Sequence, residues 1–564
     1  MLGGRPARRT LPSSFFVLCV TLLLLTDGKV SSAAPCAAPP KPVVDAASQR
    51  ELGALNAQLQ DMLTRFTELH PDVRALRRTI ESKGTCASEP SVPAATVGED
   101  CEPPGHTPSP APPVGVDTPA KPPPEASTAA KPAMGDQVVI NPEVTHQVMA
   151  GFGTNNRLWD DPHVSNAKST VIPPAAQREI LTRLYTDLGL TRVRPVIEPG
   201  IEPVNDNEDP FTFAWSKFDF RGRKNDDHVK FVKQAMPYGL RTFWPAPIAL
   251  EPWMSASNPD EYVEWAMALL LRWRDLGLEL PFYSPMNEPG NVAWHRSPGM
   301  SAVWMTEVVK RLGRRMRAEG LRTMLVVPDD INPTEAYKRA VPILEDPEAR
   351  QYVGALAYHL YGGEERHKAT MRDLALKYRI PIWMSEYSVS DYATYSGALR
   401  WAQLIDQLIT VDGVSAVDFL FGFFGSYADR GAHSLVSIDF DGGVYCGYTL
   451  MPAYYLTGQY SRFVRPGYVR VDAHSRSPGI HVSAFKRPSE IVVVAINSTQ
   501  VPRIVEFSVS GGAALQRVSS IRTSPTERWQ ELPAITPSGS RFGGLLPAES
   551  VTTFVARLAD TSER

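Results

Sequence analysis

Cysteine is scarce in this sequence, with 5 in 564 residues. These cysteines form no Cys-x-x-Cys pair and no Cys/His cluster with the spacing of a zinc site. No glycine-rich phosphate-binding loop follows any of the apolar runs described below. The sequence therefore predicts no metal site and no cofactor.

An excess of charge of one sign and long hydrophobic runs are also missing. The formal net charge is −3, which leaves no basic surface for nucleic acid or an anionic membrane. The apolar run at residues 15–25 is shorter than the ~20 residues that span a bilayer. Three arginines precede it and Ser31-Ser32-Ala33 follows it. This order predicts a signal peptide over residues 1–33 and a secreted, periplasmic or cell-surface protein.

Two further segments precede the globular part of the chain. Residues 34–86 are predicted to be helical, and residues 45–82 form either a helical hairpin or a coiled coil that joins protomers. Thirteen of the 51 prolines fall within residues 90–132, so residues 87–135 are predicted to be an extended linker. At ~3.1 Å per residue it reaches on the order of 100 Å. The helical prediction rests on apolar residues spaced three and four apart: Leu52, Leu55, Leu59, Met62, Phe66 and Leu69.

From residue 136 onward, strand-like runs alternate with amphipathic helical patterns. The strand candidates are residues 146–154, 191–196, 240–246, 280–286, 323–327, 353–359, 380–385 and 414–421. Eight strands with helices between them predict an α/β fold, a (β/α)8 TIM barrel, over residues 136–460. A doubly wound open sheet is the alternative, but its glycine-rich loop is missing.

Short alternating strands follow Arg465 and predict an attached C-terminal antiparallel β-sandwich over residues 461–564. Residues 136–145 also read as a strand, although they precede the barrel. They are a candidate partner for the sandwich.

Two glutamates end predicted barrel strands. Glu288 follows the fourth strand and Glu386 ends the seventh. Barrel enzymes carry their catalytic groups at these strand ends, and two carboxyl groups ~5–5.5 Å apart perform retaining glycoside hydrolysis. Arg194 on the second strand and the pair His359 and Tyr361 on the sixth are predicted to lie at the same rim. The pattern therefore predicts a glycosidase site.

An ordered set of motifs over residues 137–560 resembles clan A glycoside hydrolases, most closely glycoside hydrolase family 30. The resemblance implies that Glu288 is the acid/base and Glu386 the nucleophile of a retaining β-glycosidase (EC 3.2.1.-). The motifs are Gly151-Phe152-Gly153-Thr154, Leu188-Gly189-Leu190-Thr191-Arg192-Val193-Arg194, Met286-Asn287-Glu288-Pro289, Tyr358-His359-Leu360-Tyr361 and Trp383-Met384-Ser385-Glu386-Tyr387.

The neighbouring polar residues have expected roles in such a site. Asn287 is expected to bind the 2-hydroxyl of the sugar, and Arg194 and Tyr361 are expected to keep Glu386 ionised. Burial is expected to raise the pKa of Glu288. His359 either orients a carboxyl group or satisfies a buried hydrogen bond.

Aromatic residues are candidates for sugar platforms, with core packing as the alternative. Members of the family commonly carry a tryptophan at the end of the eighth strand, where this chain has Phe421 and Phe423. The predicted platforms are Trp159, Trp244, Trp294 and Phe421.

The predicted partner is a carbohydrate, either a polysaccharide or a glycoconjugate. A second hypothesis from another class is a non-catalytic carbohydrate-binding protein on a glycosidase-like barrel. Two closely placed carboxylates argue against it, because a site that only binds gains nothing from holding two like charges together.

Overall fold

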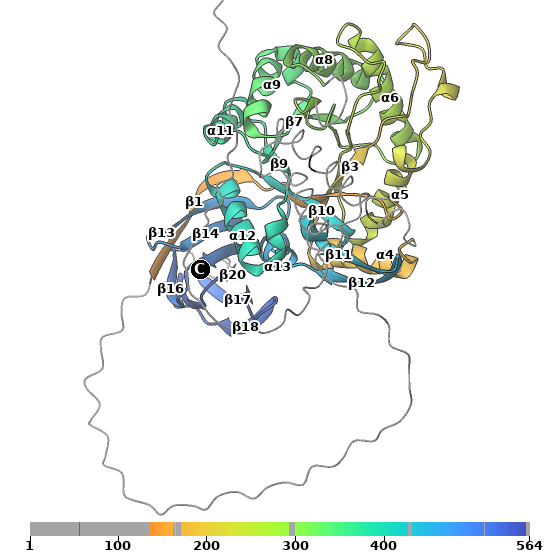
Figure 1. Ribbon diagram of the computed structural model, residues 1–564. Coiled ribbons are helices and arrows are strands. Elements are labelled where there is room, and N and C mark those ends of the chain that lie inside the picture. The colour runs from red at the N-terminus through yellow and green to blue at the C-terminus, as the bar shows by residue number, and fades with distance from the viewer. Residues whose placement is uncertain are drawn as a thin grey trace, which may run out of the picture.

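The computed structural model describes residues 136–559, apart from 162–163, 165–170, 293–298, 427–430 and 513, and also Asn56 (Figure 1). The predicted signal peptide, helical segment and linker lie outside these residues, except for Asn56. None of the helices in the described part has the length and apolar character needed to cross a bilayer.

A parallel sheet closes into a barrel in the upper half of Figure 1. Its strands follow the order β4-β3-β2-β10-β9-β8-β7-β6, with β5 also paired to β3. Between β5 and β6 the wall is closed by the Ser284 amide, which donates to the Pro245 carbonyl at 3.1 Å, and the Asn287 amide, which donates to the Pro247 carbonyl at 2.9 Å. The predicted (β/α)8 barrel is thereby confirmed. The strands are β2 (Gly151–Asn156), β3 (Arg192–Ile197), β4 (Thr242–Phe243), β5 (Ala246–Pro247), β6 (Phe282–Tyr283), β7 (Met324–Asp330), β8 (Val353–His359), β9 (Ile382–Tyr387) and β10 (Ala416–Gly425).

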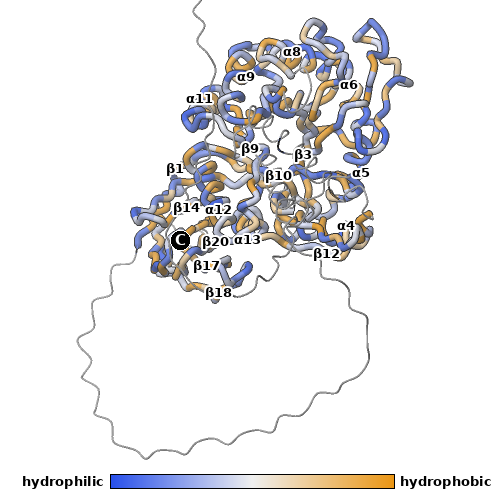
Figure 2. Tube along the Cα trace, in the orientation of Figure 1, coloured by the Kyte–Doolittle hydropathy of each residue, from blue (hydrophilic) through white to orange (hydrophobic). Residues whose placement is uncertain are grey.

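Helices surround the barrel. Helix α6 begins after Asn258, with Pro259 in its first turn followed by two acids, an order that favours a helix start. Helix α11 is mostly hydrophilic, as expected of a helix on the outer surface (Figure 2). The helices are α4 (Pro174–Leu181), α5 (Asp226–Ala235), α6 (Pro259–Asp275), α8 (Ala302–Ala318), α9 (Pro333–Glu345), α10 (Pro347–Arg350), α11 (Arg366–Tyr378), α12 (Tyr395–Thr410) and α13 (Pro452–Ser461).

The chain departs from the sequence-based strands at three places, and one of them is the strand expected over residues 240–246, which is divided into β4 and β5. The single strand expected over residues 146–154 is wrong, because Gly151, at φ +108°, turns the chain between two sheets, and β1 (Asp136–Val148) ends before β2 begins. A hairpin after β10, formed by β11 (Ser434–Asp441) and β12 (Val444–Leu450), has no counterpart among the sequence-based strands. Strand β11 pairs in parallel with β10 and widens the sheet beyond the barrel wall.

The C-terminal β-domain is a nine-stranded sheet in the order β18-β17-β20-β15-β14-β13-β1-β16-β19. All its pairs are antiparallel except β1 with β16. Phe507 on β16 packs 5.0 Å from Phe554 on β20, although four strands separate them in the sheet order, so the sheet folds over its own core. Besides β1, the strands are β13 (Val469–Ser475), β14 (Ile480–Arg487), β15 (Glu490–Asn497), β16 (Arg503–Val509), β17 (Leu515–Thr523), β18 (Gln530–Ile535), β19 (Arg541–Leu546) and β20 (Ser550–Leu558).

Strand β15 joins the two domains through both of its faces. Ile491, Val493 and Ala495 belong to the core of the β-domain. Val492 and Val494, which point the other way because side chains alternate along a strand, belong to the core of the barrel. The two domains therefore share one continuous apolar interface.

We expect a protein that ends at Arg465 to be insoluble. This truncation leaves β1 without β13 and β16 and exposes the apolar faces of α12 and α13. Protein yield in the soluble fraction and circular dichroism would measure the effect. A protein that lacks only residues 1–132 is the matched control and should stay soluble. Soluble, cooperatively folding protein ending at Arg465 would contradict the expectation.

Candidate active site

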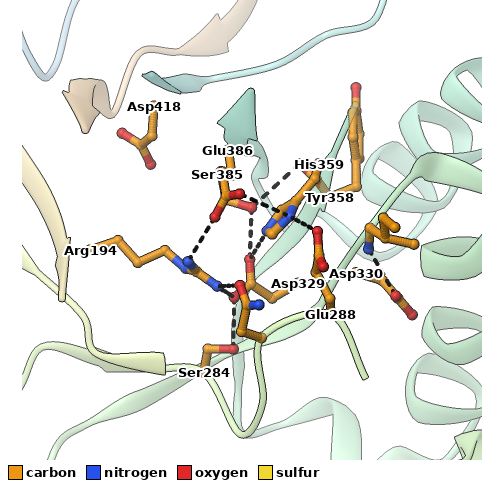
Figure 3. Close-up of polar contacts among 12 residues, drawn as sticks. Arg194, Ser284, Glu288, Asp329, Asp330, Tyr358, His359, Ser385, Glu386 and Asp418 are labelled. Atoms are coloured by element: carbon orange, nitrogen blue, oxygen red, sulfur yellow. Dashed lines mark hydrogen bonds and ion pairs between the residues drawn. The ribbon is translucent and has the colours of Figure 1, made fainter. Parts of the chain in front are cut away.

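Glu288 and Glu386 meet at the carboxyl-terminal edge of the barrel (Figure 3). Glu386 lies near the end of β9, and Glu288 lies in the loop after β6. An oxygen of each carboxyl group and a ring nitrogen of His359 all lie within 4.8 Å of one another. For comparison, retaining glycosidases hold their two carboxyl groups ~5–5.5 Å apart, and inverting enzymes hold them ~6.5–9.5 Å apart.

His359, at the end of β8, lies between the two glutamates. Its Nδ1 is 2.9 Å from Glu288 Oε1 and 3.9 Å from Glu386 Oε1. Its Nε2 is 3.3 Å from Asp329 Oδ1. Both ring nitrogens therefore face carboxylates, and a doubly protonated imidazolium satisfies all of these contacts.

Glu386 is held by donors from three other strands or strand ends. Its Oε2 accepts hydrogen bonds from Asn155 Nδ2 at 3.2 Å and from Arg194 at 3.3 Å. Its Oε1 accepts one from the Tyr361 hydroxyl at 3.1 Å. Arg194 also donates to Asn287 Oδ1 at 2.5 Å, so both predicted residues lie at the site. The donors fix the orientation of the Glu386 carboxyl group.

Asp329 is the buried anchor beneath the pair, at the end of β7. It accepts two hydrogen bonds from Arg194, at 2.6 and 3.1 Å. The hydroxyls of Ser284 and Ser385 donate to it at 3.0 and 2.7 Å. Together with His359, these contacts tie four strands or strand ends to one carboxylate.

The loop that carries Glu288 has an unusual backbone. Glu288 has φ +46°, a left-handed conformation that costs energy in a residue with a side chain and is often found at functional sites. Its amide donates to the Asp329 carbonyl at 2.9 Å, and Asn291 Nδ2 donates to Glu288 Oε2 at 2.8 Å. The Gly290 amide donates to the buried Asp330 side chain at 3.3 Å. These bonds hold the strained loop in place.

The charges of the site shift one another's pKa values. Burial alone lowers the pKa of His359, but the carboxylates of Glu386, Asp329 and Glu288 outweigh it and raise this pKa to about 10. Burial raises the pKa of Asp329, yet Arg194 and His359 bring it well below its usual range. His359 is therefore charged at neutral pH and Asp329 is ionised.

Burial raises the pKa of Glu386, and the charges of His359 and Arg194 oppose the rise. The charge of Arg194 acts in the expected direction and that of His359 was not expected, but burial outweighs both, so the net shift of the Glu386 pKa is upward. Burial also raises the pKa of Asp330 to about 6, against the opposing charge of Arg339.

The three predicted sugar platforms that lie within the described residues are packed in the interior. Trp244 is completely buried between Arg194 and Trp383, so the prediction that it binds sugar is wrong. Trp159 is 8% exposed, and its ring is stacked on Phe423 at 4.3 Å. Phe421 is 7% exposed, and Trp294 lies outside the described residues.

Sequence reasoning missed Asn155, Asp329 and Asp330. The available signal was their position, because each lies within three residues of the end of a predicted barrel strand, as Glu288 and Glu386 do. Gly153 is also required by a buried ion pair near the site. A Cβ there would lie 2.4 Å from Asp418 Oδ1, so only glycine leaves room for the buried Arg192–Asp418 ion pair beneath the site.

The ligand atoms of Glu288, His359 and Glu386 are also close enough to hold a metal ion. Metal binding through Nδ1 requires a neutral imidazole. The raised pKa of His359 works against this, because its proton competes with a metal for the same carboxylates.

We expect Asp329→Asn to lower the free energy of unfolding by about 3–5 kcal/mol, because it removes one partner from a buried ion pair. Arg194 and His359 would lose the carboxylate that both contact. Urea denaturation at pH 7 measures the loss. Asp373→Asn, which changes a surface carboxylate, is the matched control. A loss below ~1 kcal/mol would count against the role of Asp329 as the anchor.

The same network predicts a decline in stability at alkaline pH. The pKa of His359 is about 10 in the folded protein and ~6.5 in an unfolded chain. A raised pKa means that the folded state binds the proton more tightly, so the stabilisation is full below pH ~6.5 and is lost as pH rises towards 10. Urea midpoints measured between pH 6 and 10 should fall in the wild type and fall less in His359→Gln. An equal fall of the urea midpoint with pH in both proteins would show that His359 does not cause the decline in stability.

The fold and this site define a class: a (β/α)8 barrel with a β-domain and a close carboxylate pair at the catalytic rim. No protein-family model matches the chain. The chain is 29% identical over 262 residues to glucuronoxylanase XynC of Bacillus subtilis strain 168, covering 45% of this chain and 57% of that protein. The chain thus spans little more than half the length of this curated relative.

Solved structures share the fold. A GH30 endoxylanase from Clostridium papyrosolvens C71 superposes with a TM-score of 0.60 at 22% identity, covering 75% of this chain and all of that one. The endo-β1,6-glucanase BT3312 superposes with a TM-score of 0.59 at 20% identity, covering 77% and 96%. The chain resembles clan A glycoside hydrolases, and among them it is most like glycoside hydrolase family 30.

Proposed function

We propose that this protein is a secreted retaining β-glycoside hydrolase in which Glu386 is the nucleophile and Glu288 the acid/base. The observation that carries the proposal is the close approach of Glu288, Glu386 and His359, with ligand atoms within 4.8 Å. Two carboxyl groups this close suit direct attack by one of them on the substrate.

The reaction proceeds in two steps. In the first, a Glu386 oxygen attacks the anomeric carbon while Glu288 gives its proton to the departing glycosidic oxygen. In the second, Glu288 removes a proton from a water molecule, and that water displaces Glu386 from the sugar. Glu288 is then protonated again, and the anomeric configuration is unchanged after two inversions.

The charges of the site support these roles. Arg194 and His359 contribute two positive charges, Asp329 contributes a negative one, and Glu386 contributes a second in the ionised form that the first step requires. These four charges balance when Glu288 is protonated, which is the form that the first step requires. His359 contacts Glu288 directly, so its charge also stabilises the carboxylate that Glu288 becomes after it donates.

The substrate is proposed to be a polysaccharide or glycoconjugate. The similar proteins are named for different substrates, a glucuronoxylan and a β1,6-glucan. The predicted signal peptide and the proline-rich linker favour a polysaccharide outside the cytoplasm. Because Trp159, Trp244 and Phe421 are buried, we expect hydrogen-bonding groups at the rim to contribute most to recognition.

A panel of activated aryl β-glycosides, together with xylan and β1,6-glucan, tests this function. We expect turnover of at least one member, with retained anomeric configuration by proton NMR. Glu386→Ala protein is the background control. Binding of a glycan without turnover of any member would favour the carbohydrate-binding alternative. An inverted product would refute the double-displacement mechanism.

A further inference from the structure

A large pocket lies at the end of the barrel opposite to the glutamate pair. Ala150, Ile382 and Ser415 line it, and they lie where the strands β2, β9 and β10 begin. Its other walls come from the end of β1, from α11 and α12, and from Arg470 on β13, so the pocket lies where the barrel meets the β-domain (Figure 1). Its volume of about 940 Å³ is within the range of sites that bind small molecules.

Apolar side chains form most of the pocket wall. The buried ones are Met149, Ala375 and Ile382, and the exposed ones are Val148, Leu376 and Val411. Leu376 is 71% exposed although it belongs to α11, which is otherwise mostly hydrophilic (Figure 2). Apolar side chains that gather in a concave site and stay open to solvent indicate a binding surface.

Two arginines at the pocket lack an ion-pair partner. Arg470 is only 9% exposed, and its Nε donates to Gln147 Oε1 at 2.8 Å. Within the described residues, Arg470 forms no ion pair, and neither does Arg379, which is exposed at the end of α11. Burial lowers the pKa of Arg470, and the charges of Asp472 and Asp406 oppose this fall only in part. A buried guanidinium without a paired anion is costly, and a bound anion would remove that cost.

The end of α12 also faces the pocket, and its last carbonyl groups carry a partial negative charge that would repel an anion. These carbonyls are already occupied by donors. Gln147 Nε2 donates to the carbonyls of Ile409 at 2.7 Å and Val414 at 3.0 Å. Arg372 donates to the Val411 carbonyl at 2.9 Å. The two arginines without an ion pair therefore remain available to an anion.

A neutral sugar suits this pocket less well, because its hydroxyls need hydrogen-bond partners. The polar side chains of the lining have already committed their donors. The Ser415 hydroxyl donates to the Ile382 carbonyl at 3.1 Å, and the Thr410 hydroxyl donates to the Asp406 carbonyl at 2.7 Å. The Gln147 amide is engaged on both of its sides. What the pocket offers is apolar surface and positive charge.

We propose that this pocket binds a medium-chain fatty acid, whose carboxylate pairs with Arg470 and whose acyl chain lies against the apolar wall. A guanidinium presents its donors as a planar fork that matches a carboxylate, and Arg379 adds a second positive charge at the pocket. The acyl chain removes exposed apolar surface from water. The proposal is independent of the glycosidase activity, because the pocket lies at the opposite end of the barrel.

Isothermal titration calorimetry on the full chain at neutral pH tests the proposal, with hexanoate, octanoate and decanoate below their micelle concentrations. The Kd should tighten by roughly three- to fourfold for each added methylene. Decan-1-ol, which lacks the charge, should bind at least about tenfold more weakly than decanoate, and decyltrimethylammonium should not bind. The absence of decanoate binding, an affinity that does not depend on chain length, or equal binding of the alcohol would each overturn the proposal.

Three variants locate the site. Arg470→Met keeps an extended apolar side chain and should weaken decanoate binding at least about tenfold. Arg379→Gln and Leu376→Gln change exposed residues that the fold does not need, and each should weaken binding by about threefold or more. Arg541→Gln and Leu545→Gln, both exposed on β19, are the matched controls and should bind as the wild type. Unchanged decanoate affinity in both Arg379→Gln and Leu376→Gln would overturn the proposal even if Arg470→Met failed to fold.

Other occupants of the pocket would give different results. If the apolar stripe of residues 45–82 covered it, Leu55→Gln combined with Leu59→Gln in the full chain would tighten decanoate binding at least about tenfold. If a second copy of the chain covered it, Leu376→Gln would halve the mass measured by light scattering. Either result would overturn the proposal.

Discussion

Glu386→Ala is expected to lower hydrolysis of every substrate by at least about 10⁴-fold, because it removes the nucleophile of the first step. Both steps of the reaction pass through the bond between Glu386 and the sugar. The leaving group should therefore matter little, and even an activated aryl glycoside should not restore turnover. Initial rates on that substrate, at saturating and at low concentration, measure the loss.

Azide gives this variant a second readout. The shortened side chain leaves space near Asn155, Arg194 and Tyr361, which hold the carboxylate in the wild type. An azide ion in that space attacks the anomeric carbon once, so the product should be a glycosyl azide of inverted configuration. Glu345→Ala is the matched control and should keep full activity. Full activity in Glu386→Ala, or an azide product with retained configuration, would contradict the assignment.

Glu288→Ala is expected to act differently. Loss of the general acid should lower hydrolysis of substrates with poor leaving groups by about 10²–10⁴-fold. Substrates with good leaving groups need little protonation and should still form the bond to Glu386. The second step then lacks its base, so the covalent intermediate should accumulate and appear as a burst of released aryl alcohol. Stopped-flow absorbance and mass spectrometry of the intact protein would detect it.

Azide should rescue Glu288→Ala with retained configuration, because it needs no base and attacks the intermediate from the side that water uses. The size of the rescue should rise with azide concentration until the first step limits the rate. The two variants therefore differ in the stereochemistry of a single product. The same anomer from both would show that Glu288 and Glu386 do not have the proposed roles.

The polar site residues that were predicted from the sequence share one property. Glu288, Glu386, Arg194, His359 and Tyr361 all interrupt or follow an apolar run at the end of a strand. In a barrel every such end meets at one rim, so the pattern of strands was enough to predict that these side chains lie together. The structure brings all five into one hydrogen-bonded network.

The prediction that Trp244 binds sugar failed for a related reason. An aromatic ring fills a core as well as it stacks on a sugar, and nothing in the local sequence distinguishes the two uses. Trp244 shows this most clearly. It follows β4 at the same level as Arg194, but its side chain packs among Val326, Ala355 and Trp383 inside the barrel.

The alternation of strands and helices and the strand-end positions of the two glutamates follow from the order of residues along the chain, because hydrophobic periodicity is a local property. The charges that surround the two glutamates come from distant parts of the chain and follow only from the folded arrangement. Asp329 accepts hydrogen bonds from residues up to 135 positions away. Charge interactions depend on distance in space and on burial, and neither is written in the spacing of residues along the chain.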